Sequence, residues 1–119
     1  MKILVIHGHP DKESYCQAIF QTIVSNLDTS RHEIKTISLN EEDFDPVLRY
    51  GYRKRMEEDP FILRSQELIQ WADHLIFVYP IWWSSMPSLM KGWIDRVFTP
   101  GIAYSANDQG SFIWNYLRG

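Results

Sequence analysis

The sequence predicts an α/β fold in which a parallel sheet is covered by helices on both faces. Two short apolar runs, 2–6 and 75–79, have the unbroken hydrophobic pattern of strands that are buried on both faces. Segments with helical hydrophobic spacing follow each run, and a third such segment lies between them. Strands that alternate with helices in this way are typical of a doubly wound parallel sheet.

The first predicted strand runs into a loop that is punctuated by glycine and proline. Ser14 and Gln17 then have the spacing of a capping box, and apolar residues from 16 to 27 recur at helical spacing, which predicts a capped helix. A helix N-terminus offers free N–H groups and the positive end of a dipole, both of which favour an anion such as a phosphate. The alternative is a plain turn capped by Ser14, because the loop has neither a dinucleotide nor a Walker pattern.

The middle of the chain supplies a second strand, a long connection and a second helix. Residues 33–39 predict a strand that is more polar than the first, as an outer strand is. The connection 40–59 is acidic and aromatic, and we expect it to be a functional cover or to contain a short helix. A helix from Pro60 to Ala72 then precedes 75–79, the expected central strand.

The last part of the chain predicts one more helix. Apolar residues from 86 to 97 form a stripe at helical spacing. Residues 111–119 are too short to supply another strand and its crossover, so we expect three parallel strands, whereas a complete sheet of this class has five.

The bulk properties predict one soluble domain over residues 1–119. The chain is 45% hydrophobic, carries a formal net charge of −3 and scatters its basic residues, which argues against nucleic acid as a partner. A single cysteine fits a reducing compartment, and no apolar run approaches the roughly 20 residues of a membrane span. With no cleavable signal pattern at the start, we expect a cytoplasmic location.

Two histidines and the cysteine lie near the first loop. His7 and His9 are two residues apart, but no third ligand of matching character is nearby, so we expect no metal site. His9 is interpreted as a polar donor on the loop and His7 as a packed residue. Cys16 falls on the apolar face of the predicted helix, which favours a structural thiol over a nucleophile.

The turn at 80–84, after the expected central strand, lies where open α/β sheets bind ligands. Its backbone N–H groups and indole side chains would suit a planar, electron-poor ring such as a flavin, which needs hydrogen-bond donors and apolar cover. The alternative is that Trp82 and Trp83 fill a core or a subunit interface.

Several motifs occur in an order that runs along nearly the whole chain. They are His9-Pro10 with Ser14, FDPVL at 44–48, WADH at 71–74, PIWW at 80–83, Met86-Pro87, KGWIDRVF at 91–98 and GIAY at 101–104. Together they resemble the flavodoxin-like NAD(P)H:quinone oxidoreductases. The resemblance implies a flavodoxin-like three-layer α/β/α fold and a homodimer that binds FMN or FAD. It also implies transfer of two electrons from NAD(P)H to quinones or similar acceptors.

The resemblance further implies a set of site residues. His9, Tyr15 and Cys16 belong to the phosphate and ribityl side of the flavin, beside the helix start capped by Ser14. The loop that begins at Pro80 cradles the isoalloxazine ring with Ile81, Trp82, Trp83 and Ser84. Tyr104 matches an aromatic residue that lines the substrate pocket from the partner subunit. No catalytic residue is assigned.

Members of this family continue past the point that matches Gly119, with a further strand, a glycine-rich flavin-contacting loop and a segment carrying tyrosine and histidine. The resemblance therefore implies a chain that is shortened at its C-terminus. Two alternative functions follow. The chain is an ancillary subunit of the potassium-efflux type that docks through 40–59, or it is a truncated, inactive homologue.

Overall fold

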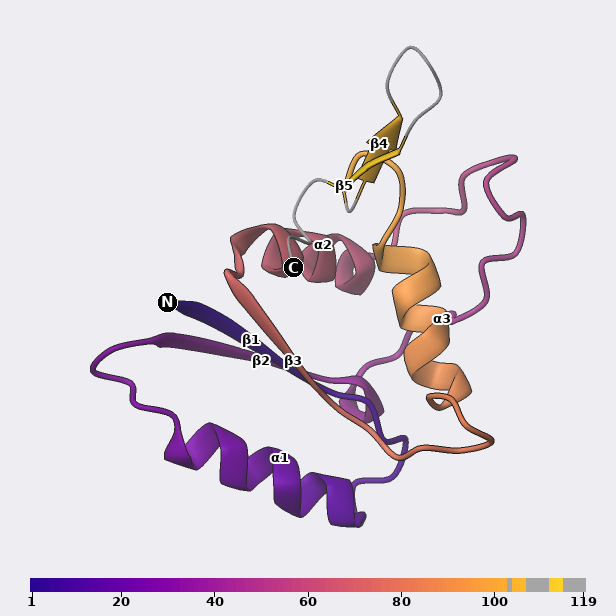
Figure 1. The fold of residues 1–119 in the computed structure, drawn as a ribbon. Coiled ribbons are helices and arrows are strands. Elements are labelled where there is room, and N and C mark those ends of the chain that lie inside the picture. Colours follow the sequence, from indigo (N-terminus) through magenta and orange to yellow (C-terminus); the bar gives the residue numbers. More distant parts are fainter. Residues whose placement is uncertain (103, 107–111, 115–119) are drawn as a thin grey trace.

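The computed structural model describes residues 1–102, 104–106 and 112–114, with side chains through Ile102. Its elements alternate along the chain as the hydrophobic pattern predicts (Figure 1). They are β1 (Lys2–His7), α1 (Tyr15–Asn26), β2 (Glu33–Ser38), the short 3-10 helix η1 (Leu39–Glu41), α2 (Pro60–Trp71), β3 (His74–Val78), α3 (Ser88–Val97), β4 (Tyr104–Ala106) and β5 (Phe112–Trp114).

The main sheet has three parallel strands in the order β2-β1-β3. Ile3 on β1 lies opposite Ile34 on one side and His74 on the other. The parallel sheet and the outer position of β2 are confirmed, whereas the prediction that the strand at 75–79 is central is wrong. The centre is β1, and β3 lies at an edge of this sheet. Among the described residues β3 has a neighbouring strand on one side only, and the middle of the strand (75–77) is half-buried.

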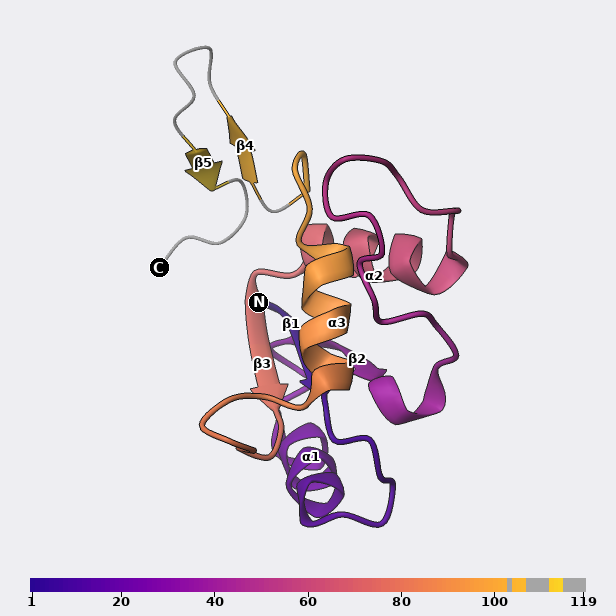
Figure 2. The same cartoon turned by 90° about the vertical axis from the view of Figure 1, so that its right-hand side faces the viewer.

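Helices cover both faces of this sheet, so the three-layer α/β/α architecture is confirmed (Figure 1, Figure 2). The side chains of β1 alternate between the two cores, which explains why its sequence is apolar throughout. Ile3 and Val5 pack toward α1, in a cluster with Phe20. Leu4 and Ile6 pack toward α2 and α3.

The core between α2 and α3 is organised around Trp93, which is fully buried. Its indole Nε1 donates a hydrogen bond of 3.0 Å to Oγ of Ser65 on α2, so the polar atoms of both side chains are satisfied inside the core. Asp59 caps the start of α2, because its carboxylate accepts from the N–H groups of Phe61 and Ile62. The long connection is therefore tied to a helix at its end.

The long connection begins with η1, the short helix that its length predicts, and has no regular structure from residue 42 to 59. The first part of this connection, around residues 45 and 46, lies against α3. A Cβ atom on Gly92 would come within 2.3 Å of the carbonyl oxygen of Pro46, so only glycine allows this close approach. Arg96 donates a 2.7 Å hydrogen bond to the carbonyl oxygen of Asp45. These contacts fix the first part of the connection on the helix.

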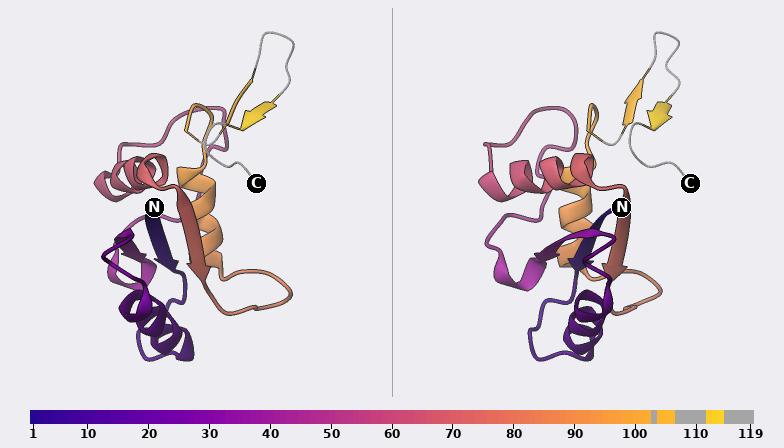
Figure 3. Two further views of the ribbon diagram at one scale, coloured as in Figure 1. Left: turned by 60° about the vertical axis from the view of Figure 1, so that its left-hand side comes forward. Right: turned by 90° about the vertical axis from the view of Figure 1, so that its left-hand side faces the viewer.

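After α3 the chain forms a short antiparallel hairpin, β4–β5, that points away from the main sheet (Figure 3). The last segment therefore pairs with its own preceding strand, and in the described residues it adds nothing to the parallel sheet. None of the helices in the described ranges has both the length and the apolar character that crossing a bilayer requires.

Candidate functional site

The loops that follow β1 and β3 meet at the carboxyl edge of the sheet (Figure 1). His9 on the first loop and Trp82 on the second place their ring centroids 5.4 Å apart, with the ring planes at 78°. This edge-to-face contact brings together the two segments that the sequence predicts for the two ends of one ligand. The residues concerned are separated by more than 70 positions in the chain.

The first loop is held in shape by its own side chains. The N–H of Asp11 donates to Nδ1 of His9 at 2.9 Å, and the N–H of Glu13 donates to the Asp11 carboxylate at 2.9 Å. Because Nδ1 of His9 accepts a hydrogen bond, the neutral ring carries its proton on Nε2, which is free to donate. His9 lies on a loop as predicted, and its role as a donor stays a prediction, because in the hydrogen bond with Asp11 its ring is the acceptor.

The start of α1 has the donors that an anion needs. Oγ of Ser14 accepts from the N–H of Gln17 at 3.2 Å, so the predicted cap is confirmed. Among the described residues, the N–H groups of Tyr15 and Cys16 in the first turn make no hydrogen bond. The Tyr15 side chain is 83% exposed, whereas Cys16 is half-buried and packs on the α1 side of the sheet. The N-terminus of α1 thus offers two unpaired donors next to His9.

The second loop contains a tight turn in an unusual conformation. Trp83 and Ser84 have φ angles of 52° and 60°, the values of a type I′ turn, a shape that usually requires glycine or asparagine. Hydrogen bonds between Trp82 and Ser85, of 2.9 and 3.0 Å, close it. A non-glycine pair in this region stores conformational strain of about 1–3 kcal/mol for each residue. Strain of this kind is concentrated at ligand-binding sites.

The side chains of this second loop are turned to the surface. Trp83 is fully exposed and Ile81 is 75% exposed, while Trp82 is 45% exposed and Pro80 is half-buried. The alternative that Trp83 fills a core is therefore wrong. The N–H groups of Trp83 and Ser84 make no hydrogen bond within the described part of the chain, so they remain available to a ligand.

Gly8 holds the two loops close together. Its N–H donates to the carbonyl oxygen of Val78 at 2.8 Å, which joins the end of β1 to the end of β3. A Cβ atom at this position would lie 2.5 Å from Sδ of Met90, a buried residue in the first turn of α3. A side chain here would therefore force the Met90 side chain to move within the core.

Two residues near the site were not predicted as parts of it. His7 is fully buried at the end of β1, as its interpretation as a packed residue requires. Its Nδ1 lies 3.1 Å from Nδ2 of Asn40, which lies 3.1 Å from the carbonyl oxygen of His9 as well. No signal in the sequence indicates Asn40, because it belongs to the long connection and reaches the loop only through the fold.

Burial, followed by the charge of nearby His9, lowers the pKa of His7 below its ordinary value, while Glu41 acts in the opposite direction. The unfolded chain therefore takes up a proton at His7 near pH 6.5 while the folded chain resists it. We expect the free energy of unfolding to be highest above this pH and to decrease as the pH falls through it.

Urea unfolding between pH 8 and pH 5.5 measures this decline, and the variant His7→Leu should show a smaller one. The matched control is His74→Leu, because His74 is exposed at the start of β3. Equal slopes for the wild type and His7→Leu would contradict the assignment of the pH dependence to His7.

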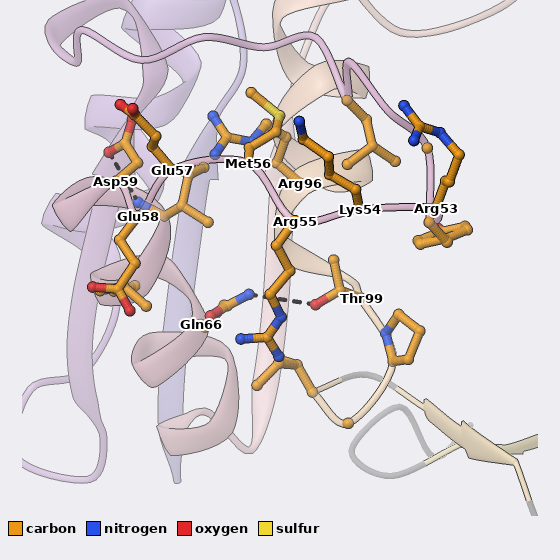
Figure 4. A pocket seen from close by; sticks show the side chains of 18 residues that line it. Arg53, Lys54, Arg55, Met56, Glu57, Glu58, Asp59, Gln66, Arg96 and Thr99 are labelled. Atoms are coloured by element: carbon orange, nitrogen blue, oxygen red, sulfur yellow. Dashed lines mark hydrogen bonds between the residues drawn. The ribbon is translucent and has the colours of Figure 1, made fainter.

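A separate cavity of about 580 Å³ lies at the other end of α3, between the second half of the long connection, α2 and the segment after α3 (Figure 4). Charges of opposite sign line different parts of it. Glu57, Glu58 and Asp59 are at one end, and Arg53 and Lys54 are at the other. None of the predicted site residues whose side chains the structure describes lines this cavity.

Tyr104, the predicted substrate-binding residue, lies in β4, outside the residues whose side chains are described. The other predicted residues lie on the two loops and in the first turn of α1. This arrangement offers an anion site at the helix start, and a row of exposed indole surface and free N–H groups on the neighbouring loop. An elongated ligand with a phosphate at one end and a flat ring at the other fits both parts.

Comparison with known proteins agrees with this architecture. Residues 1–118 match the model of a protein family described as having a flavodoxin-like fold. A crystal structure of Smu.1420 from Streptococcus mutans UA159 superposes with a TM-score of 0.81 at 38% identity, over 94% of this chain and 60% of that one. The NAD(P)H:quinone oxidoreductase from Methanothermobacter marburgensis gives a TM-score of 0.75 at 28% identity, over 88% and 57% of the two chains.

Among curated relatives, NAD(P)H dehydrogenase [quinone] 1 from Cavia porcellus is 29% identical over 93% of this chain and 49% of its own length. The chain spans about half the length of the curated relatives that it matches.

Proposed function

The chain belongs to the flavodoxin-like family, and from this premise we propose that it is a flavin-dependent oxidoreductase that transfers two electrons from NAD(P)H to quinones or similar acceptors. The observation that carries the proposal is the contact between His9 and Trp82, 5.4 Å between centroids, because it joins an anion-binding helix start to an exposed aromatic loop. Relatives and structural neighbours with quinone reductase names support the same reaction class.

In this proposal the first loop holds the phosphate of FMN or FAD. Nε2 of His9 and the free N–H groups of Tyr15 and Cys16 are donors, and the dipole of α1 adds a favourable partial charge. Ser14 contributes by capping the helix, which fixes the direction of these donors. Cys16 acts through its main chain, and its half-buried thiol has a packing role.

The second loop holds the flavin ring. Pro80 and Ile81 lead into the turn, and the free N–H groups of Trp83 and Ser84 would donate hydrogen bonds to the polar atoms of the ring. The indole of Trp82 excludes water from one side. The flavin supplies the hydride chemistry once bound, and the protein supplies position, hydrogen bonds and protection from solvent.

A partner subunit is part of the proposal. Trp83 is fully exposed in the single chain, and we propose that a homodimer covers it. The family resemblance adds that Tyr104 of the partner subunit lines the acceptor pocket. A single cysteine fits a reducing, cytoplasmic location.

Absorption and fluorescence titration of the purified protein with FMN and FAD tests the proposal. We expect a flavin spectrum, quenched flavin emission and flavin-dependent oxidation of NADH or NADPH by a soluble quinone. A protein that binds flavin without turnover would support the ancillary alternative. A protein that folds and binds neither flavin would refute the proposal in favour of an inactive homologue.

A further inference from the structure

We infer that Asn40 is a positioning residue that clamps the first cofactor loop to the end of β1, and that the clamp holds only while Nδ1 of His7 is unprotonated. The inference rests on the proposed flavin site, because the loop it concerns is the one that would hold the phosphate. Asn40 contacts His9 through the main-chain carbonyl oxygen of that residue, and not at the ring Nε2 that is proposed to donate to the phosphate. It acts through His9.

The orientation of the Asn40 amide follows from its two partners. The carbonyl oxygen of His9 can only accept a hydrogen bond, so the atom 3.1 Å away must be the NH2 group of Asn40. The same NH2 group lies 3.1 Å from Nδ1 of His7, which must therefore be an acceptor. The proton of the neutral His7 ring is then on Nε2.

The clamp connects distant parts of the site. Asn40 lies in η1, just after the end of β2, and its amide links this segment to the main chain of His9. The ring of His9 in turn contacts Trp82 on the second loop. The Asn40 side chain thus holds β1 and the first loop in place, and through His9 it also acts on the contact with Trp82.

The clamp has an energetic cost, because it leaves two buried polar atoms without a hydrogen-bond partner. Within the described residues, Nε2 of His7 and Oδ1 of Asn40 are buried and have no hydrogen-bond partner. Unpaired buried groups are rare and costly in native proteins, and those that persist often have a functional reason. Rotating the Asn40 amide by 180° would not satisfy Oδ1, because Oδ1 would then face the carbonyl oxygen of His9, which is also an acceptor.

Protonation of His7 releases the clamp. The imidazolium form has a proton on both nitrogens, so Nδ1 would face the NH2 group donor to donor. The amide must turn away, and the carbonyl oxygen of His9 loses its donor. The charged or titratable groups that act on His7 are His9, which opposes its protonation, and Glu41, which favours it; the α1 side contributes the ring of Phe20 at 5.1 Å between centroids.

The tautomer of His7 is the direct test, and it needs no flavin. Long-range proton–nitrogen NMR of the 15N-labelled wild type at pH 8 should show the Nε2–H form. In Asn40→Asp the carboxylate can only accept, so His7 should change to a form with Nδ1 protonated. A wild-type ring with its proton on Nδ1, or an unchanged tautomer in a folded Asn40→Asp protein, would overturn the inference.

Flavin affinity is the second test, with FMN as the probe and fluorescence quenching as the measurement. We expect Asn40→Ala to weaken FMN binding roughly tenfold at pH 8, the effect of losing one buried hydrogen bond. The matched control is Asn26→Ala, because Asn26 also donates to a main-chain carbonyl, that of Thr22 at 2.8 Å, but lies at the exposed end of α1. Equal affinities of the wild type and Asn40→Ala would overturn the inference.

The pH profile separates positioning from mere stability. Wild-type affinity should fall between pH 7.5 and 5.5 more steeply than the affinity of Asn40→Ala, in which no clamp remains to be released. Titration of the FMN phosphate affects both proteins equally and cancels in the comparison. If the wild type binds neither FMN nor FAD, the proposed function fails, while the NMR result alone then decides the state of the clamp.

Discussion

Replacing Trp93 by alanine should lower the free energy of unfolding by about 3–5 kcal/mol, a large part of the 5–15 kcal/mol that is typical of a folded domain. Trp93 is fully buried, and its ring lies against Phe77 and Phe98 with centroids 6.5 and 5.9 Å away. The substitution leaves a cavity between α2, α3 and the sheet, and it also removes the partner of Ser65. Urea unfolding followed by circular dichroism measures the loss.

The chain offers a matched control for this prediction. Trp83→Ala removes the same side chain from a fully exposed position, so its effect on stability should stay within about 0.5 kcal/mol. The variant Trp93→Phe keeps most of the apolar volume and should lose about 1–3 kcal/mol, because Oγ of Ser65 is left unpaired in the core. Similar losses for Trp83→Ala and Trp93→Ala would contradict the burial argument.

The fold could be predicted from the sequence because the signals for its elements are local. The apolar run of β1 and the helical stripe of α3 report burial directly, and Ser14 marks the start of α1. The order of the strands was harder to predict from the sequence. The apolar run 75–79 predicts a central strand, yet β3 lies at an edge of the described sheet. An apolar pattern indicates burial by helices and does not reveal how many strands lie beside it.

The candidate site was predicted in outline, from the loops that follow two strands and from a family resemblance. The sequence places His9 and Trp82 on loops of the same edge, but only the fold brings their rings into contact. The type I′ turn at Trp83 and Ser84 could not be predicted, because neither residue favours a positive φ. Asn40 was missed for a similar reason, since its contacts join segments that are more than 30 residues apart.

Replacing Gly8 by valine should weaken flavin binding roughly tenfold to a hundredfold. Gly8 is buried, and even a Cβ atom there would come within 2.5 Å of Sδ of Met90. Overpacking of this kind costs about 1–3 kcal/mol of stability. If the loop must regain its native packing to bind flavin, the same amount is lost from the binding free energy, at about 1.4 kcal/mol for each factor of ten in affinity. The strain falls between the first loop and the Met90 side chain of α3, and we expect it to disturb the loop that carries His9. Fluorescence titration with FMN measures the affinity, and urea unfolding reports the accompanying loss of stability.

A double-mutant cycle with Met90→Ala tests the cause of this loss. The shorter side chain at position 90 makes room for the valine, so Gly8→Val should cost much less flavin affinity in the Met90→Ala background than in the wild type. The comparison of backgrounds removes the effect that Met90→Ala has by itself on the core. If Gly8→Val costs the same in both backgrounds, the clash with Met90 is not what positions the loop. If flavin affinity is instead recovered in the Met90→Ala background, the close approach of Gly8 to Met90 is what positions the first loop in the site.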